Sequence, residues 1–302
     1  MAEPTVDLAL DARTILGESP VWDDRIGRLY FVDINERRLH AWEPQSGERI
    51  SIEAPEQVGC VALTNDTGKV LLGLHRRVVV VDVASRALCA SLATTPDSHG
   101  IDDMRFNDGK GAPDGALIIG RMHSKWREGK PGRLYRLAPP GELQEVLEGT
   151  PIGLPNGMAW DMERREMYFV DSKAQTITAF ATDEGGVPLE GAAGRLVATV
   201  PSEEGVPDGM TIDRTGNLWV ALGEAGAVTC FDAQSGAQLH RVALPVGRPT
   251  ACTFGGADLA VLYVTTREEK GPSAAEHWGG VFAVRVPGVA GRAGGFPVRL
   301  PA

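Results

Sequence analysis

Polar residues recur at one place in a repeated pattern of this sequence. Segments beginning ESPVWD, NGMAWD and DGMTID each carry a polar residue, a short apolar run, an Asp, a turn and a second apolar run. Looser copies bring the number of first positions to six, namely Glu18, Gly59, Asn107, Asn156, Asp208 and Thr250. Carboxylate and amide oxygens suit a hard divalent ion such as Ca²⁺, Mg²⁺ or Mn²⁺. No His or Cys occupies these positions, which argues against an ordinary Zn²⁺ site.

A plainer interpretation of the same positions stays open. Asn and Asp before Gly are ordinary turn chemistry, so these residues could cap turns or bind only water. If they converge instead, two carboxylates aimed at one narrow axis would be costly to bury without a compensating cation.

The spacing of the first positions indicates what must hold them. Positions 18, 59, 107, 156, 208 and 250 differ successively by 41, 48, 49, 52 and 42 residues. Short β-type runs separated by Gly, Asp and Asn turns fill each interval, as in units of a four-stranded propeller blade. The sequence therefore predicts an all-β, six-bladed propeller as one domain over residues 1–302. We expect Thr5–Leu10 to close the ring against the GVFAVRV segment, and residues 285–302 to form a loose tail.

Two further expectations concern packing. The inner strands of a propeller line a central channel, so equivalent residues far apart in sequence meet at one mouth. Trp22, Trp160 and Trp219 recur in inner or second strands, and we expect them to pack between blades.

Composition restricts the partners. The 302 residues carry a formal net charge of −10 and no basic tract, so we expect no nucleic-acid or anionic-membrane partner.

The first ten residues lack a basic signal region and a long apolar run, and no stretch is apolar enough to span a bilayer. Four scattered cysteines fit a cytoplasmic protein with reduced thiols, although a Cys230–Cys252 bridge stays open. Protein partners are not predicted.

Four motifs carry a resemblance to a known family. GESPVW (17–22), RFNDGK (105–110), LPNGMAWD (154–161) and VPDGMTID (206–213) resemble, in that order, the gluconolactonase or senescence marker protein (regucalcin) family. The resemblance covers about residues 17–286. It implies a six-bladed propeller that hydrolyses sugar lactones with one divalent cation, most often seen as Ca²⁺, with Zn²⁺, Mn²⁺ or Mg²⁺ as alternatives. It also implies metal ligands at Glu18, Asn156 and Asp208, and substrate contacts at Arg105 and Asn107.

The sequence departs from the family at one place. After the third inner strand the family often reads Gly-Thr-Met followed by acidic residues, one of which contacts the sugar. Here the segment is GRMHSK (120–125), so His123 or Lys125 stands where a carboxylate is usual. We expect this change to alter substrate preference and not the metal site.

The expected reaction is hydrolysis of an aldonolactone. The cation would polarise the lactone carbonyl, and either Asp208 or a metal-bound hydroxide would provide the activated water. Arg105 and Asn107 would hydrogen-bond the sugar hydroxyls or the developing oxyanion.

Three other functions remain open. The same site could hydrolyse another ester or a phosphotriester. The protein could be a calcium-binding regulator without turnover, although three protein oxygens predict weak Ca²⁺ binding. It could also be a propeller that docks other proteins, a role that does not need Glu18, Asn156 and Asp208 together.

Overall fold

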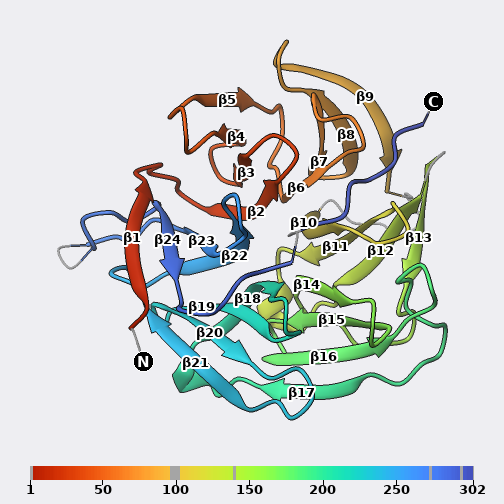
Figure 1. Ribbon diagram of the computed structural model, residues 1–302. Coiled ribbons are helices and arrows are strands. Elements are labelled where there is room, and N and C mark those ends of the chain that lie inside the picture. Colours follow the sequence, from red (N-terminus) through yellow and green to blue (C-terminus); the bar gives the residue numbers. More distant parts are fainter. Residues whose placement is uncertain (1–2, 96–102, 139–140, 272–273, 293–294, 302) are drawn as a thin grey trace.

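Six four-stranded antiparallel sheets form a ring in the computed structural model, which describes residues 3–95, 103–138, 141–271, 274–292 and 295–301 (Figure 1). The first three blades contain the strands β2 (Gly17–Asp23), β3 (Arg28–Asp33), β4 (Arg38–Trp42) and β5 (Arg49–Glu53); β6 (Cys60–Leu63), β7 (Lys69–Gly73), β8 (Arg77–Asp82) and β9 (Ala87–Thr94); and β10 (Met104–Gly111), β11 (Leu117–His123), β12 (Arg133–Ala138) and β13 (Glu142–Val146). A short 3-10 helix, η2 (Trp126–Glu128), follows β11.

The second half of the ring repeats this order. Its strands are β14 (Pro155–Asp161), β15 (Glu166–Asp171), β16 (Thr176–Ala181) and β17 (Arg195–Thr199); β18 (Val206–Ile212), β19 (Leu218–Gly223), β20 (Ala227–Phe231) and β21 (Gln238–Ala243); and β22 (Pro249–Gly255), β23 (Val261–Thr266) and β24 (Val281–Arg285). The 3-10 helix η3 (Ser202–Glu204) precedes β18. The predicted six-bladed all-β propeller is confirmed.

The sixth blade is completed from the other end of the chain. Strand β1 (Thr5–Leu10) pairs antiparallel with β24, from Thr5 opposite Arg285 to Leu10 opposite Val281. In Figure 1 the red N-terminal strand lies beside the blue β24. The predicted closing strand is therefore confirmed with its predicted bounds, and β24 has a partner on both sides.

Packing between blades holds the ring together. Each of six buried apolar clusters joins two neighbouring blades, and the cluster between the second and third blades also includes Val298 of the C-terminal segment. Trp22 joins the cluster between the first and sixth blades, Trp160 that between the third and fourth, and Trp219 that between the fifth and sixth. The expectation of inter-blade tryptophans is confirmed.

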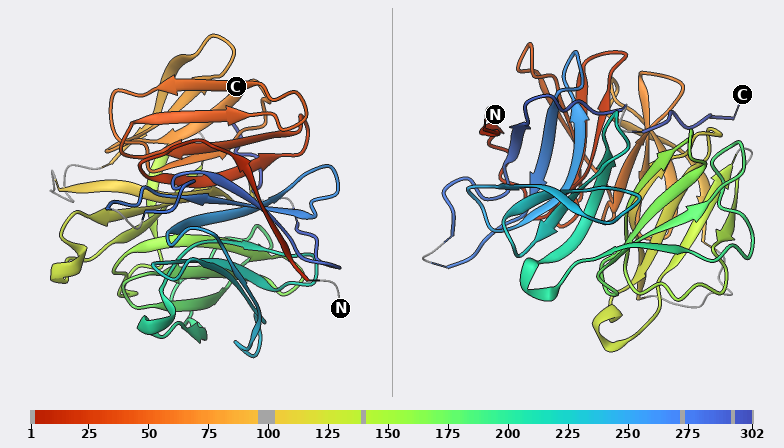
Figure 2. Two further views of the ribbon diagram at one scale, coloured as in Figure 1. Left: turned by 90° about the vertical axis from the view of Figure 1, so that its left-hand side faces the viewer. Right: turned by 60° about the horizontal axis from the view of Figure 1, so that its bottom comes forward.

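The C-terminal segment differs from the expected loose tail. Val298 is buried, and its N–H donates to Leu63 O at 2.8 Å, while the Phe296 N–H donates to Gly111 O at 3.4 Å. A Cβ on Gly111 would lie 1.7 Å from Phe296 O, so Gly111 permits this close passage. The segment crosses the ring towards the second and third blades, as Figures 1 and 2 show. The expectation of a loose tail is therefore wrong for this part of the segment, because hydrogen bonds to the second and third blades order it.

Two smaller points complete the description. All four cysteines are free, so the Cys230–Cys252 bridge does not form. In the described part of the chain, no helix is long and apolar enough to cross a membrane.

Candidate functional site

The inner strands begin around one cavity of about 220 Å³. Five of the six first positions line it, namely Glu18, Asn107, Asn156, Asp208 and Thr250, and so does Arg105. All five residues proposed from the sequence as ligands or substrate contacts therefore lie in one cavity, brought together from four blades.

Gly59, the sixth position, has a packing role instead. A Cβ at Gly59 would lie 2.2 Å from Phe106 O and 2.7 Å from Asn107 O, distances that side chains do not tolerate. The missing side chain lets the backbone that carries Asn107 approach the second blade.

A β-bulge recurs where the inner strands carry these residues. The pairing register shifts between Glu18 and Val21, between Phe106 and Gly109, between Pro155 and Met158, and between Pro207 and Met210. Ser19, inside the first shift, has a positive φ of 49°. Bulges redirect side chains out of the regular alternation of a strand. Here they lie at or beside the residues that line the cavity.

Aspartates at the ends of second strands hold the loops that lead into two of these positions. Asp33 accepts hydrogen bonds from the N–H groups of Ile15 at 2.8 Å and Leu16 at 3.1 Å, just before Glu18. Asp171 accepts them from Gly153 at 2.7 Å and Leu154 at 2.9 Å, just before Asn156. The backbone that presents each candidate ligand is therefore anchored to its own blade.

A chain of hydrogen bonds fixes the amides. Arg105 Nη1 donates to Asn107 Oδ1 at 2.9 Å, and Asn107 Nδ2 donates to Asn156 Oδ1 at 2.8 Å and to Pro155 O at 2.9 Å. Asn156 Nδ2 donates to Ser172 Oγ at 2.7 Å, and Ser172 Oγ donates to Pro207 O at 2.6 Å. Asn156 is therefore oriented from both ends, with its Oδ1 keeping a second lone pair.

The two carboxylates are only partly satisfied. Glu18 Oε2 accepts from the Ser19 N–H at 3.2 Å. Asp208 Oδ1 is buried and has no hydrogen-bond partner among the described residues. Buried polar atoms nearly always have partners, so this oxygen is available to accept a hydrogen bond or to bind a cation.

Burial makes both carboxyl groups costly to ionise in this cavity. Burial raises the pKa of Asp208 to about 8, and the charge of Asp108 adds to this, while Arg267 and Arg105 act in the opposite direction. Burial also raises the pKa of Glu18 well above its usual value, followed by the charges of Asp208 and Asp108. A divalent cation between the carboxylates would offset both effects.

The donor set fits a hard cation. Within the described residues, no group of three or more His, Cys, Asp or Glu side chains could hold a metal. The protein ligands of a cation here would be the two carboxylates and the Asn156 amide oxygen, with water or substrate completing the shell. This oxygen-only set is the one that Ca²⁺, Mg²⁺ and Mn²⁺ accept.

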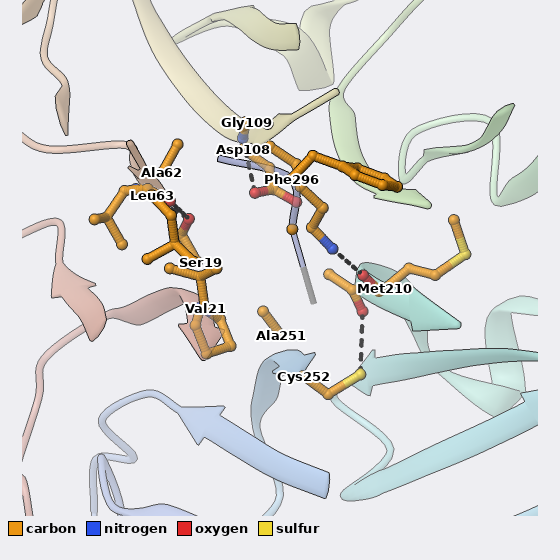
Figure 3. A pocket seen from close by; sticks show the side chains of 16 residues that line it. Ser19, Val21, Ala62, Leu63, Asp108, Gly109, Met210, Ala251, Cys252 and Phe296 are labelled. Atoms are coloured by element: carbon orange, nitrogen blue, oxygen red, sulfur yellow. Dashed lines mark hydrogen bonds between the residues drawn. The ribbon is translucent and has the colours of Figure 1, made fainter. Parts of the chain in front are cut away.

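Further along the channel lies a smaller void of about 10 Å³, enough for about one water molecule (Figure 3). Asp108 Oδ1 accepts from the Gly109 N–H at 2.8 Å there, and Lys110 Nζ donates to Met210 O at 2.8 Å. Burial raises the pKa of the Asp108 carboxyl. The sequence analysis did not single out Asp108, although it directly follows Asn107.

Other lining residues also escaped the sequence analysis. The loop after β11 contributes Trp126 and Arg127, and the sixth blade contributes Arg248 and Arg267. Ser172 lines the cavity as well. Ser172 directly follows Asp171 and Arg248 stands two residues before Thr250, but no residue type or spacing marked either as a site residue.

The residues after the third inner strand require a correction. Met122 lines the cavity, whereas His123 and Lys125 are not among its lining residues. His123 is buried at the end of β11, and its Nδ1 accepts the Lys125 N–H at 3.0 Å. Strand alternation turns Met122 and His123 to opposite faces. His123 thus closes a turn and does not line the cavity.

Comparisons with known proteins identify the family and agree with the fold. The family model described as "SMP-30/Gluconolactonase/LRE-like region" matches residues 16–268. Pentonolactonase XacC of Haloferax volcanii is 36% identical, over 90% of this chain and 88% of its own. A luciferin-regenerating enzyme structure matches with a TM-score of 0.88 and 28% identity, covering 98% of this chain and 100% of its own. A calcium-binding protein, regucalcin from Agrobacterium tumefaciens, matches with a TM-score of 0.84 and 26% identity, covering 96% of both chains.

Proposed function

Because the chain belongs to the SMP-30/gluconolactonase/LRE-like family, which includes sugar lactonases, we propose that it hydrolyses sugar lactones with a divalent cation. Glu18, Asn156 and Asp208 would hold that cation. One observation carries the proposal above the others: these residues from three blades meet in one cavity, where Asp208 Oδ1 is buried without a partner. When bound, the cation supplies Lewis-acid polarisation of the lactone carbonyl.

Arg105 and Asn107 would form different hydrogen bonds with the sugar. Arg105 Nη1 is engaged by Phe106 O and Asn107 Oδ1, at 2.8 and 2.9 Å, which leaves its other N–H groups as donors. Both N–H groups of Asn107 are engaged, so it can only accept from a sugar hydroxyl, through the remaining lone pair of Oδ1. Arg105 is thus the donor and Asn107 the acceptor.

Asp208 is the proposed general base. A carboxylate has two oxygens, so one can face the cation while the other accepts the proton of the attacking water. The hydrogen-bond chain from Arg105 to Ser172 keeps the neighbouring amides from rotating during this step. The water oxygen adds to the lactone carbonyl carbon, the ring C–O bond then breaks, and the ring oxygen leaves as an alkoxide that takes up the proton held by Asp208, which gives the open sugar acid.

The test is lactone hydrolysis by pH-stat on chelator-treated protein, with Ca²⁺, Mg²⁺, Mn²⁺ or Zn²⁺ added back. Gluconolactone, galactonolactone and xylonolactone would be offered. We expect cation-dependent turnover, and a loss of at least ~100-fold in kcat/KM for Asp208→Asn. Asp24→Asn, in an exposed turn, is the matched control and should keep full activity. Turnover that survives both the chelator and Asp208→Asn would contradict the proposal.

A calcium-binding role without turnover is the second candidate. It is favoured by the similarity to the calcium-binding regucalcin structure. Calorimetry of Ca²⁺ binding to the same stripped protein separates the two. Binding that Glu18→Gln abolishes, with no hydrolysis of any lactone offered, would favour this candidate over the lactonase.

A further inference from the structure

Two arginines of the sixth blade, Arg248 and Arg267, are neighbours in the lining of the cavity. Arg248 directly precedes β22 and Arg267 directly follows β23, next to the paired residues Pro249 and Thr266, and the Arg267 N–H donates to Arg248 O at 3.0 Å. Both side chains line the cavity. Like charges on neighbouring chain segments repel each other, so two arginines here favour a ligand of opposite charge.

In the part of the chain that the structure describes, only one of these two arginines, Arg248, forms an ion pair with a neighbouring carboxylate. Glu224 Oε2 lies 3.3 Å from Arg248 Nη2. Within the described residues, no carboxylate lies within ion-pair distance of the Arg267 guanidinium, which acts on Asp208 only through its longer-range charge.

The lining of the cavity carries more arginines than carboxylates. Four arginines line it, namely Arg105, Arg127, Arg248 and Arg267. Glu18 and Asp208 are assigned to the cation, and Glu224 already faces Arg248. With the cation bound, the cavity would therefore carry a positive charge, although the net charge of the protein is −10. A positively charged cavity favours an anionic ligand.

We propose that Arg248 and Arg267 form an anion subsite, and that the preferred substrate is a sugar lactone carrying a carboxylate or phosphate group away from its ring carbonyl. This inference rests on the proposed lactonase function. Arginine suits the role because its planar group of N–H donors matches carboxylate and phosphate oxygens.

The experiment compares kcat/KM for one neutral and two anionic lactones. Gluconolactone is the neutral substrate, glucarolactone carries the carboxylate, and phosphogluconolactone carries the phosphate. We expect at least one anionic lactone to be preferred, with a kcat/KM that falls as NaCl is added. Arg267→Gln should reduce the anionic-to-neutral ratio about tenfold, mainly through KM, and Arg267→Lys should restore part of it. Arg285→Gln, whose partner is Asp7 on the outer strands, is the matched control.

Binding measurements separate this inference from the lactonase proposal. Calorimetry with glucarate and phosphogluconate, on wild type and Arg267→Gln, reports the subsite without turnover. Binding that depends on Arg267 supports the subsite even if no lactone is hydrolysed, which would contradict only the lactonase. Hydrolysis of gluconolactone at least as fast as both anionic lactones, with no Arg267-dependent binding of either acid, would overturn the subsite and leave the lactonase standing.

Discussion

Ser172 lies outside the proposed set of metal ligands but orients one of them, Asn156. Its buried Oγ accepts from Asn156 Nδ2 and donates to Pro207 O, one residue before Asp208. Ser172→Ala leaves the Asn156 amide with an unpaired donor, so we expect Ca²⁺ affinity to fall by roughly 10- to 100-fold, as when other partners of metal ligands are removed. Calorimetric titration measures this loss, and Ser85→Ala at an exposed turn is the control. Unchanged affinity in Ser172→Ala would remove Asn156 from the proposed ligand set.

The inner strand is the element that presents the site, and its close packing makes it sensitive to glycine substitution. Gly59 precedes β6 and touches the backbone of Phe106 and Asn107. Backbone atoms cannot swing aside, so Gly59→Ala must shift the strand that carries Asn107. We expect a loss of about 1–3 kcal/mol in the free energy of unfolding, with a raised KM for gluconolactone. Gly247→Ala is the control, because its nearest contact is 3.5 Å away. If the two variants unfold at the same temperature, the contact between β6 and β10 can accommodate a Cβ at Gly59, which would contradict the prediction.

At the scale of the whole molecule, the ring depends on a strand from the opposite end of the chain. Without residues 1–10, β24 has an unpaired edge, and the apolar clusters lose Val6 and Leu10. We expect the truncated protein to unfold at a lower temperature and to associate at high concentration, because exposed edges pair with other chains. Each backbone hydrogen bond lost contributes about 1 kcal/mol. Removal of residues 1–4 alone, which keeps β1, is the control for calorimetry and light scattering. Identical melting of both truncations would contradict a closing role for β1.

Much of the site could be predicted because it is repeated. The strand–turn–strand pattern aligned Glu18 with Asn156 and Asp208, and a propeller turns equal positions in the repeat into neighbours in space. The number of blades and the closing strand followed from the same periodicity and from the length of the chain.

Residues that line the cavity without belonging to the repeat could not be found in this way. Arg267 reaches it from the end of β23, and Arg127 from the 3-10 helix after β11. The role of His123 could not be predicted, because the choice between Met122 and His123 depends on which face of β11 meets the cavity. The C-terminal segment was also misjudged, since its order comes from contacts with Leu63 and Gly111.

The sequence by itself therefore determined the periodic features, namely the blade count, the ring closure and the polar residues that begin the inner strands. These features depend on a local sequence pattern that is repeated along the chain, and such a repeat can be detected in the amino-acid sequence alone. Only the tertiary structure decided the charge of the cavity, the hydrogen-bond chain through Asn107 and Asn156, and the unpartnered oxygen of Asp208. The physical reason is that charge balance and hydrogen-bond satisfaction depend on groups from several blades at once, and no single segment contains them.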